Sequence, residues 1–215
     1  MIVGPILALL LRDELRGSLF YIVGAAMALA SAVLVMCVKF PFRAPEEGVH
    51  LVSIDRFFLP RGATIALVIA LITAALGIMM TTRMTVEFCS SVMAGFVVAA
   101  LALHIPAVKN ARFASAVGNA LAIIAILAMF AHDDIFDATL KPMLFGFGIA
   151  LSSSEQPYKL LNSCDHCQRS TAESTYFLSS DGGLFLGIAA GWQLTTAVKS
   201  AEQVVLALLV VATIL

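Results

Sequence analysis

Long apolar segments alternate with short polar ones through the first 131 residues of the chain. Four of them, 18–38, 63–81, 86–105 and 113–131, contain no proline and few charged side chains. Each approaches the roughly 20 apolar residues that a helix needs to cross a bilayer. An unbroken apolar run of this length is typical of a transmembrane helix. We therefore predict four membrane-spanning helices, which together make a membrane region over residues 17–131.

Two other segments of this half do not have the pattern of a span. Residues 1–16 contain an apolar run of eleven residues, which is too short to cross a membrane as a helix. The run lacks the positive start and the small-residue cleavage site of a signal peptide, so we expect a retained, interfacial or partly inserted segment. Residues 39–62 contain three prolines and mixed charges, and are predicted to form a polar loop.

The second half of the chain is less regular. Residues 132–182 are acidic at their start and polar after Ser152, and are predicted to form a loop region. Within it, the ten apolar residues 142–151 suit a short, tilted or re-entrant segment better than a span. Residues 183–215 are apolar again and are predicted to form a helical hairpin. The number of membrane crossings between residues 132 and 215 stays open.

Composition supports the membrane as the solvent of this chain. It is 60% hydrophobic and 13% charged, whereas soluble domains are about 45–50% apolar and about 25% charged. A chain of 215 residues has too little interior to bury so much apolar surface in water. We predict an all-α fold, a multi-pass transmembrane bundle of four spans with two or three short or marginal C-terminal segments. The lipid bilayer is its first partner, and we expect the inner (cytoplasmic) membrane of a bacterium.

Charge excludes one class of partner and gives an orientation. The net charge is −1 and no basic tract is present, so we expect no nucleic acid partner. If seven segments cross, five Lys and Arg residues lie on the N-terminal side of the first span and eight on the other side. This excess places the 39–62 loop and the cysteine-containing loop in the cytoplasm. If residues 142–151 turn back, the cysteines change sides.

Small residues recur at every fourth position in several apolar segments. In lipid, helices associate by close van der Waals packing, which small residues permit. Each glycine in a helix interior costs about 1 kcal/mol relative to alanine, so a glycine stripe requires a compensating contact. The longest ladder contains three glycines in register, and shorter patterns contain one glycine each. The predicted helix-packing residues are Gly183, Gly187, Gly191, Gly24 and Gly95. The pattern is equally consistent with contacts within the chain, with other membrane subunits, and by self-association.

Few polar side chains fall within the apolar segments. Ionisable groups at bilayer depth are costly and are usually functional. Glu87, Asn119 and Gln193 are the candidates for a polar path, although Glu87 also suits an interfacial or paired structural role. Lys199 and Glu202 are three residues apart and are expected to pair on one helix face. The scarcity of charge within the spans argues against an ion-coupled transporter or a proton pump.

The sequence Cys164-Asp165-His166-Cys167 is the one concentration of reactive side chains. A thiol-redox role needs an exposed low-pKa thiolate and normally a second cysteine pair to pass electrons onward. The other two cysteines, Cys37 and Cys89, lie far apart within predicted spans, where buried packing is the expected role. A structural disulfide and thiols without chemistry are the remaining interpretations of the pair.

The same residues are also a candidate metal site. Cys164, His166 and Cys167 offer three ligands, but tetrahedral zinc takes four. The acidic segment at His132, Asp133 and Asp134 supplies the rest only if both loops lie on the same side of the membrane. The metal, if any, is not identified by this pattern, and we assign no cofactor.

No nucleophile motif, phosphate loop or metalloprotease motif is present in the sequence, so we assign no catalytic residue. The leading hypothesis is an integral membrane structural or assembly subunit of a larger complex, such as secretion, conjugation or energy-transducing machinery. One alternative is a membrane thiol-redox or metal-binding protein acting through the Cys164 segment. Another alternative is a small-solute transporter or channel.

Overall fold

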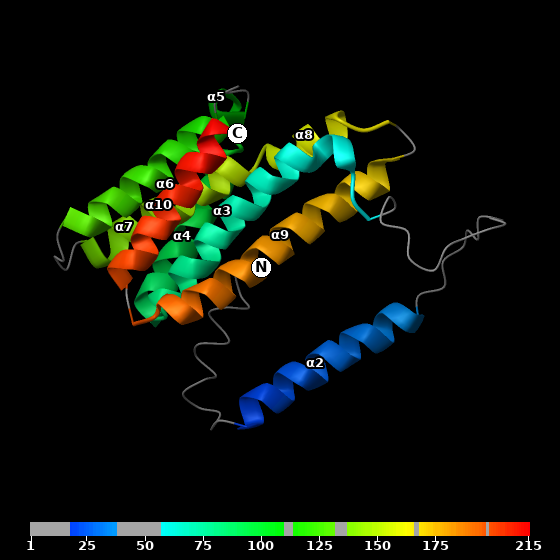
Figure 1. Cartoon of the computed structure of the whole chain (residues 1–215), viewed down its shortest axis with the longest axis horizontal. Helices are drawn as coiled ribbons and strands as arrows, with labels where there is room; N and C mark the ends of the chain where they lie inside the picture. The colour runs from blue at the N-terminus through cyan, green and yellow to red at the C-terminus, as the bar shows by residue number, and fades with distance from the viewer. Residues whose placement is uncertain (1–17, 38–56, 110–113, 132–136, 166–167, 197) are drawn as a thin grey trace. The chain divides into compact units, whose positions relative to one another are not determined.

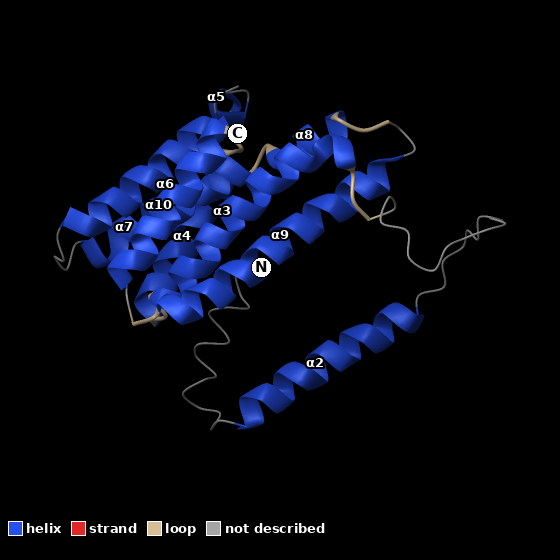
Figure 2. Cartoon of the chain, viewed as in Figure 1, coloured by secondary structure: helices blue, strands red, loops and turns tan. Residues whose placement is uncertain are grey.

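The computed structural model describes residues 18–37, 57–109, 114–131, 137–165, 168–196 and 198–215. The chain divides into two compact units, Met1–Ser53 and Ile54–Leu215, and each is described by itself. All regular secondary structure in the described residues is helical, as Figure 2 shows, and none of them lies in a strand. The prediction of an all-α chain is confirmed over these residues.

The first unit contributes one described helix, α2 (Ser18–Cys37). It is apolar on every side, and its large side chains are exposed, with Met27 at 70% and Met36 at 86%. A side chain built on Gly24 would meet no atom within 4 Å. Residues 1–17 and most of the predicted 39–62 loop lie outside the described residues.

The second unit is built from long helices joined by short connections. Its long described helices are α3 (Ala63–Thr82), α4 (Val86–Ala102), α6 (Ala114–Ala131), α7 (Asp137–Ser153), α9 (Arg169–Leu194) and α10 (Val198–Ile214). The short ones are the 3-10 turn η2 (Pro60–Gly62), α5 (Pro106–Lys109) and α8 (Gln156–Asn162). The bounds of α2, α3, α4 and α6 agree with the four predicted apolar helices to within a few residues.

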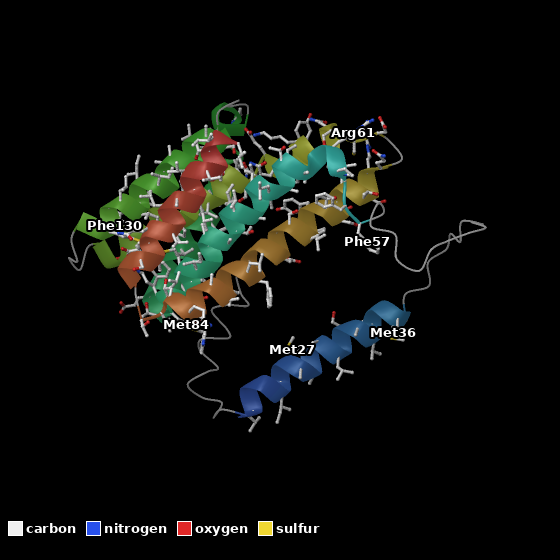
Figure 3. All side chains as sticks on the ribbon, in the orientation of Figure 1. Met27, Met36, Phe57, Arg61, Met84 and Phe130 are labelled. Carbon is white, nitrogen blue, oxygen red and sulfur yellow. The ribbon has the colours of Figure 1, made fainter. Side chains whose placement is uncertain are left out.

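Successive long helices of this unit run in alternating directions (Figure 1). A turn of three residues after α3 reverses the chain into α4, and Thr85 caps α4 by accepting a hydrogen bond from the Phe88 amide at 3.2 Å. α6 and α7 form an antiparallel pair, in which Gly118 lies against Ser152 and Gly148 against Ala122. α9 then runs parallel to α3, and α10 returns antiparallel to it. Arg61 at the start of α3 and Met84 just after its end mark opposite ends of the bundle (Figure 3).

The packing order of the helices differs from their order in sequence. α3 packs against both α9 and α10, α10 also packs against α6, and α7 packs against α6 and α4. α9 therefore lies at one edge of this arrangement, where α3 is its main neighbour among the described helices. One long face of α9 is left without a helix of this unit against it.

The region 132–182 differs from the sequence expectation. The short apolar segment predicted at 142–151 is part of α7, a helix of 17 residues that includes Pro142. Pro142 is the sixth residue of α7, where it removes one backbone hydrogen bond to the preceding turn, and the helix continues through it. α7 runs the length of the bundle instead of turning back, so Ser153 lies at the end opposite Asp137.

The predicted polar loop is also largely helical. α9 begins at Arg169 and continues without interruption through the glycine ladder, so the ladder is the second half of a helix of 26 residues. The polar residues before the ladder adopt a helix because one face of it is buried, at Ala172 and Thr175. Hydroxyl-rich composition indicated a loop, and tertiary packing overrides that tendency.

Helix length supports only part of the prediction that several helices cross the membrane. In the part of the chain that the structure describes, one helical stretch, Pro60–Thr82, is both long and apolar enough to cross a membrane. The other strongly apolar stretches are shorter, at Ile22–Leu34, Val86–Ala102, Ala114–Phe130 and Ser200–Ile214. That the chain crosses the membrane more than once therefore stays a prediction.

Candidate functional site

The glycine ladder of α9 lies directly against the backbone of α3. A Cβ atom built on Gly183 would lie 2.7 Å from the Cα of Ala70, and one on Gly187 would lie 2.7 Å from the Cα of Ala74. Gly191 continues the row, with Ile78 opposite it. These glycines are buried, and any side chain at Gly183 or Gly187 would collide with main-chain atoms. The compensating contact for this ladder is therefore made within the chain.

A second set of glycines brings α7 against α4 and α6. A Cβ on Gly95 of α4 would lie 2.6 Å from the backbone nitrogen of Phe147, and Gly146 of α7 faces the backbone of Val92. On the other side of α7, a Cβ on Gly148 would lie 2.6 Å from the nitrogen of Ala122. Gly95 was predicted from the sequence as a helix-packing residue. The glycines of α7 were missed because they fall in the segment that was predicted to be short and irregular.

The three candidate path residues are not brought together. Asn119 is buried between α6 and α7, toward the end of the bundle marked by Arg61. Glu87 and Gln193 are both exposed and lie at the other end, near the start of α4 and the end of α9. Glu87 occupies the first turn of α4, where a carboxylate favours the positive end of the helix dipole.

Asn119 belongs instead to a hydrogen-bonded network at the junction of α6, α7 and α8. The Ser152 hydroxyl donates to the Asn119 carbonyl oxygen Oδ1 at 2.7 Å, and the Ser115 hydroxyl donates to the Ser152 backbone carbonyl at 3.2 Å. Gln156 at the start of α8 donates from Nε2 to the Ser115 hydroxyl at 3.2 Å. Asn119, Ser152 and Gln156 are all less than 5% exposed. The polar side chains at this junction therefore bond to one another.

A buried ion pair closes the opposite end of the bundle. The Arg83 guanidinium, just after α3, donates from Nη2 to the carboxylate of Glu202 near the start of α10. Glu202 is 2% exposed, whereas the side chain of Arg83 is 30% exposed. From the sequence, Glu202 was expected to pair with Lys199, whose side chain lies outside the described residues. Arg83 was missed as the partner because the two positions are brought together only by the antiparallel packing of α3 and α10.

The cysteine segment lies at the end of the bundle marked by Arg61. Cys164 is a partly exposed free thiol two residues beyond the end of α8, and its sulfur donates to the Leu161 carbonyl at 3.2 Å. Asp165 forms an exposed ion pair with Arg61 at 3.8 Å. His166 and Cys167 lie outside the described residues, so a thiol pair or metal site that uses them stays a prediction.

The proposed completion of a metal site from the acidic segment stays a prediction. His132, Asp133 and Asp134 lie outside the described residues, but the flanking helices α6 and α7 meet at the end of the bundle opposite Cys164. α7 separates the two ends by about 25 Å, at 1.5 Å per residue. Among the described residues, no group of three or more His, Cys, Asp or Glu side chains lies close enough together to hold a metal ion.

The two remaining cysteines differ from each other. Cys89 is buried in α4, as expected for a small apolar side chain. Cys37 is exposed at the end of α2, which differs from the buried role expected of it.

One ionisable side chain of the bundle was missed by the sequence analysis. Asp181 lies in α9 two residues before Gly183, and it is exposed. Two residues turn a helix by about 200°, so Asp181 points away from α3 when Gly183 packs against it. No described side chain donates a hydrogen bond to Asp181 or forms an ion pair with it. The available signal was Ser179, which is in register with the glycines and extends the helical pattern upstream of Asp181.

Asp181 shares its face of α9 with large apolar side chains. We define the outer α9 face as one stripe of exposed side chains along this helix, at spacings of three and four residues. It consists of Phe177, Asp181, Phe185, Ile188 and Trp192. Phe185 and Trp192 are each 70% exposed.

Comparison of the chain with protein-family models, with curated proteins and with solved structures found no match.

Proposed function

We propose that this chain is an integral membrane protein whose second unit is a lipid-embedded helical bundle. We further propose that its role is that of a structural or assembly subunit in a larger membrane complex. The observation that carries the proposal is the distribution of side chains. Large apolar residues cover the outside of the bundle, and its inside holds glycine, alanine and bonded polar groups together with large apolar side chains such as Ile72, Ile126 and Phe145. The most exposed apolar residues of the long helices include Leu67, Leu101, Ile124, Leu140, Phe185, Leu186, Trp192 and Ile214.

An exterior of this kind is stable in lipid and costly in water. Monomeric soluble proteins rarely expose extended apolar surface, whereas lipid tails contact it without penalty. The long described helices have 17 to 26 residues, which is about the length that spans the hydrocarbon core when tilt is allowed. Because the long helices alternate in direction, each carries the chain from one end of the bundle to the other.

Hydroxyl side chains within the helices support the same proposal. Where water is absent, a hydroxyl must find its partner within the protein. Five of the hydroxyls in the helix interiors donate to the backbone carbonyl one turn earlier, at 2.7 to 2.9 Å. These residues are Thr73, Thr81, Thr82, Ser91 and Thr213. The pattern satisfies their hydroxyls without solvent.

The packed interior favours a structural role over a conduit. At the α3–α9 and α7–α4 contacts, helix backbones approach so closely that an added methyl group would collide with the main chain. The buried polar groups at the two ends of the bundle bond to each other, as in the Ser152–Asn119 and Arg83–Glu202 pairs. Transport would require polar groups that line a shared space, and Glu87, Asn119 and Gln193 are separated.

The charges at the two ends of the bundle support an orientation. The described end that contains Cys164 carries Arg61, Lys109, Lys159 and Arg169, and the other end carries Arg83, Lys141 and Lys199. The excess is one residue, and the rule that cytoplasmic loops are richer in Lys and Arg places the Cys164 end in the cytoplasm. In a bacterium this corresponds to insertion in the inner membrane.

Gentle extraction of the full chain at its native level tests the proposed role. We expect the protein to resist alkaline carbonate washing and to migrate in mild detergent with other chains, as an assembly clearly heavier than 22.8 kDa plus its detergent. Extraction in a denaturing detergent is the control, since it should reduce the same sample to single chains. A stable lone monomer in mild detergent would contradict the subunit role, and release by carbonate would contradict membrane integration.

A further inference from the structure

Asp181 lies at hydrocarbon depth if the bundle spans a bilayer. Gly183 packs against Ala70 of α3 and Gly187 against Ala74, so parallel α9 places Asp181 near the level of Val68. That level is about eight residues, or about 12 Å, inside the apolar stretch Pro60–Thr82. The hydrocarbon core is about 30 Å thick, so Asp181 lies well below its surface.

Asp181 is unusual for an ionisable side chain at this depth, because it lies on the outside of the bundle. An ionisable side chain within a membrane normally faces the bundle interior or a partner. Asp181 points away from α3, is exposed, and has no hydrogen-bond or ion-pair partner among the described residues. The apolar residues beside it on the outer α9 face are satisfied by lipid, but a carboxylate is not. The carboxylate of Asp181 is therefore the group on this face that lipid alone does not satisfy.

From this position we infer that the outer α9 face docks a transmembrane helix of a different protein, one that carries a Lys or Arg at the depth of Asp181. The inference rests on the membrane-subunit function proposed above and names an interface for it. The residues Asp181, Phe185, Ile188 and Trp192 follow spacings of four, three and four, which match the seam of a packed helix pair. Large aromatic side chains are the most frequent anchors of protein interfaces.

Charge complementarity selects a different chain over a second copy of this one. α3, α4 and α6 contain no Lys or Arg, and in α7, α9 and α10 the Lys and Arg residues are confined to the first five positions. α2 also contains none. A second copy thus offers no basic group at the required depth in its described helices. Pairing through the same face would bring two carboxylates together.

The inference is tested with the full-length chain in phosphatidylcholine vesicles and designed helices as probes. The first probe is a Leu/Ala transmembrane peptide with one Lys about 12 Å from one end, and the second has Leu in place of that Lys. A third probe carries the Lys close to the peptide terminus. Energy transfer between labelled protein and labelled probe measures association at low peptide-to-lipid ratio. We expect the first probe to associate about tenfold more tightly than the other two, as a single interhelical polar contact in lipid allows.

Variants assign the preference to Asp181. Asp181→Asn should remove the advantage of the Lys probe, whereas Glu173→Gln should leave it unchanged. Glu173 is the matched control, because it is an exposed acid of α9 that lies two turns away, near the end of the bundle. A Phe185→Cys variant should cross-link to a cysteine placed next to the Lys of the first probe. This second measurement keeps the test decisive if Asp181→Asn folds poorly.

Several results would overturn the inference. These are equal binding of the Lys and Leu probes, a Lys preference that survives Asp181→Asn, or cross-linking of Phe185→Cys mainly within one chain or between two copies. Failure of the underlying function is distinguishable. If carbonate removes the protein from the vesicles, the membrane proposal fails, whereas a chain that stays in the membrane without selecting the Lys probe refutes only this interface.

Discussion

Gly187 and Gly182 lie five residues apart in α9 and have different surroundings. A Cβ on Gly187 would lie 2.7 Å from the Cα of Ala74, whereas a Cβ on Gly182 would meet no atom within 4 Å. The same substitution should therefore have opposite effects on stability. Helix propensity favours alanine at both positions, and the collision with α3 opposes it at only one.

For Gly187→Ala we expect a loss of stability of about 1–3 kcal/mol, the usual cost of overpacking an interior. For Gly182→Ala we expect a gain of up to about 1 kcal/mol. Thermal or denaturant unfolding of the purified protein in mild detergent measures both. Equal effects of the two substitutions would contradict the packing of α9 against α3.

The Ser152–Asn119 hydrogen bond is a second prediction at the scale of single residues. Both side chains are buried, and the bond joins α7 to α6 at 2.7 Å. In a double-mutant cycle with Ser152→Ala and Asn119→Ala, we expect a coupling energy of about 0.6 kcal/mol, with an upper limit near 1.7 kcal/mol, as for interhelical hydrogen bonds in lipid. A matched cycle of Ser152→Ala with Thr213→Val should show additivity, because Thr213 bonds only within α10. Additive effects in both cycles would contradict the network.

At the scale of helices, the Arg83–Glu202 pair joins the end of α3 to the start of α10. The two partners differ in burial, so removing each one should have a different cost. Arg83→Met leaves the carboxylate of Glu202 buried without a partner, for which we expect a loss of about 3 kcal/mol. Glu202→Leu replaces that buried carboxylate with an apolar group and leaves Arg83 able to reach solvent, for which we expect about 1 kcal/mol.

Denaturant titration of the two variants and of the double variant measures this difference. Arg169→Met, a change of an exposed basic residue at the start of α9, is the comparison for loss of a positive charge. If Arg83→Met costs no more than Glu202→Leu, the carboxylate is not held in the buried position that the structure shows.

The four apolar helices of the first 131 residues could be predicted because their sequences are uniform. Composition alone indicated α3, α4 and α6, and no competing tendency acts on them. The second half was harder to predict for two identifiable reasons. The apolar run 142–151 suggested a segment too short to span, although α7 begins before it and continues through Pro142, and the serines and threonines at the start of α9 suggested a loop.

For contacts between positions far apart in sequence, the type of contact could be predicted but its partner could not. The small-residue pattern indicated that Gly183, Gly187 and Gly191 pack closely against a helix, but it did not identify α3 as the neighbour. The partnership of Arg83 with Glu202 and the outward position of Asp181 depend on helix directions and packing order. Neither of these is encoded in local sequence patterns.

At the scale of the whole molecule, the central claim is that the second unit crosses the membrane several times. The alternation of its helices places Cys164 and the C-terminus at one end of the bundle and Met84 at the other end. In a bilayer the two ends face different compartments. Cysteine labelling from each side of a sealed membrane therefore tests the claim directly.

The measurement uses two single-cysteine variants with the remaining cysteines replaced by serine. One keeps Cys164, and the other carries Met84→Cys, at a position that is 50% exposed. With a membrane-impermeant maleimide, we predict that Cys164 reacts from the cytoplasmic side and Met84→Cys from the opposite side, in protein that resists carbonate extraction. Labelling of both positions from the same side, or release of the protein by carbonate, would contradict the account.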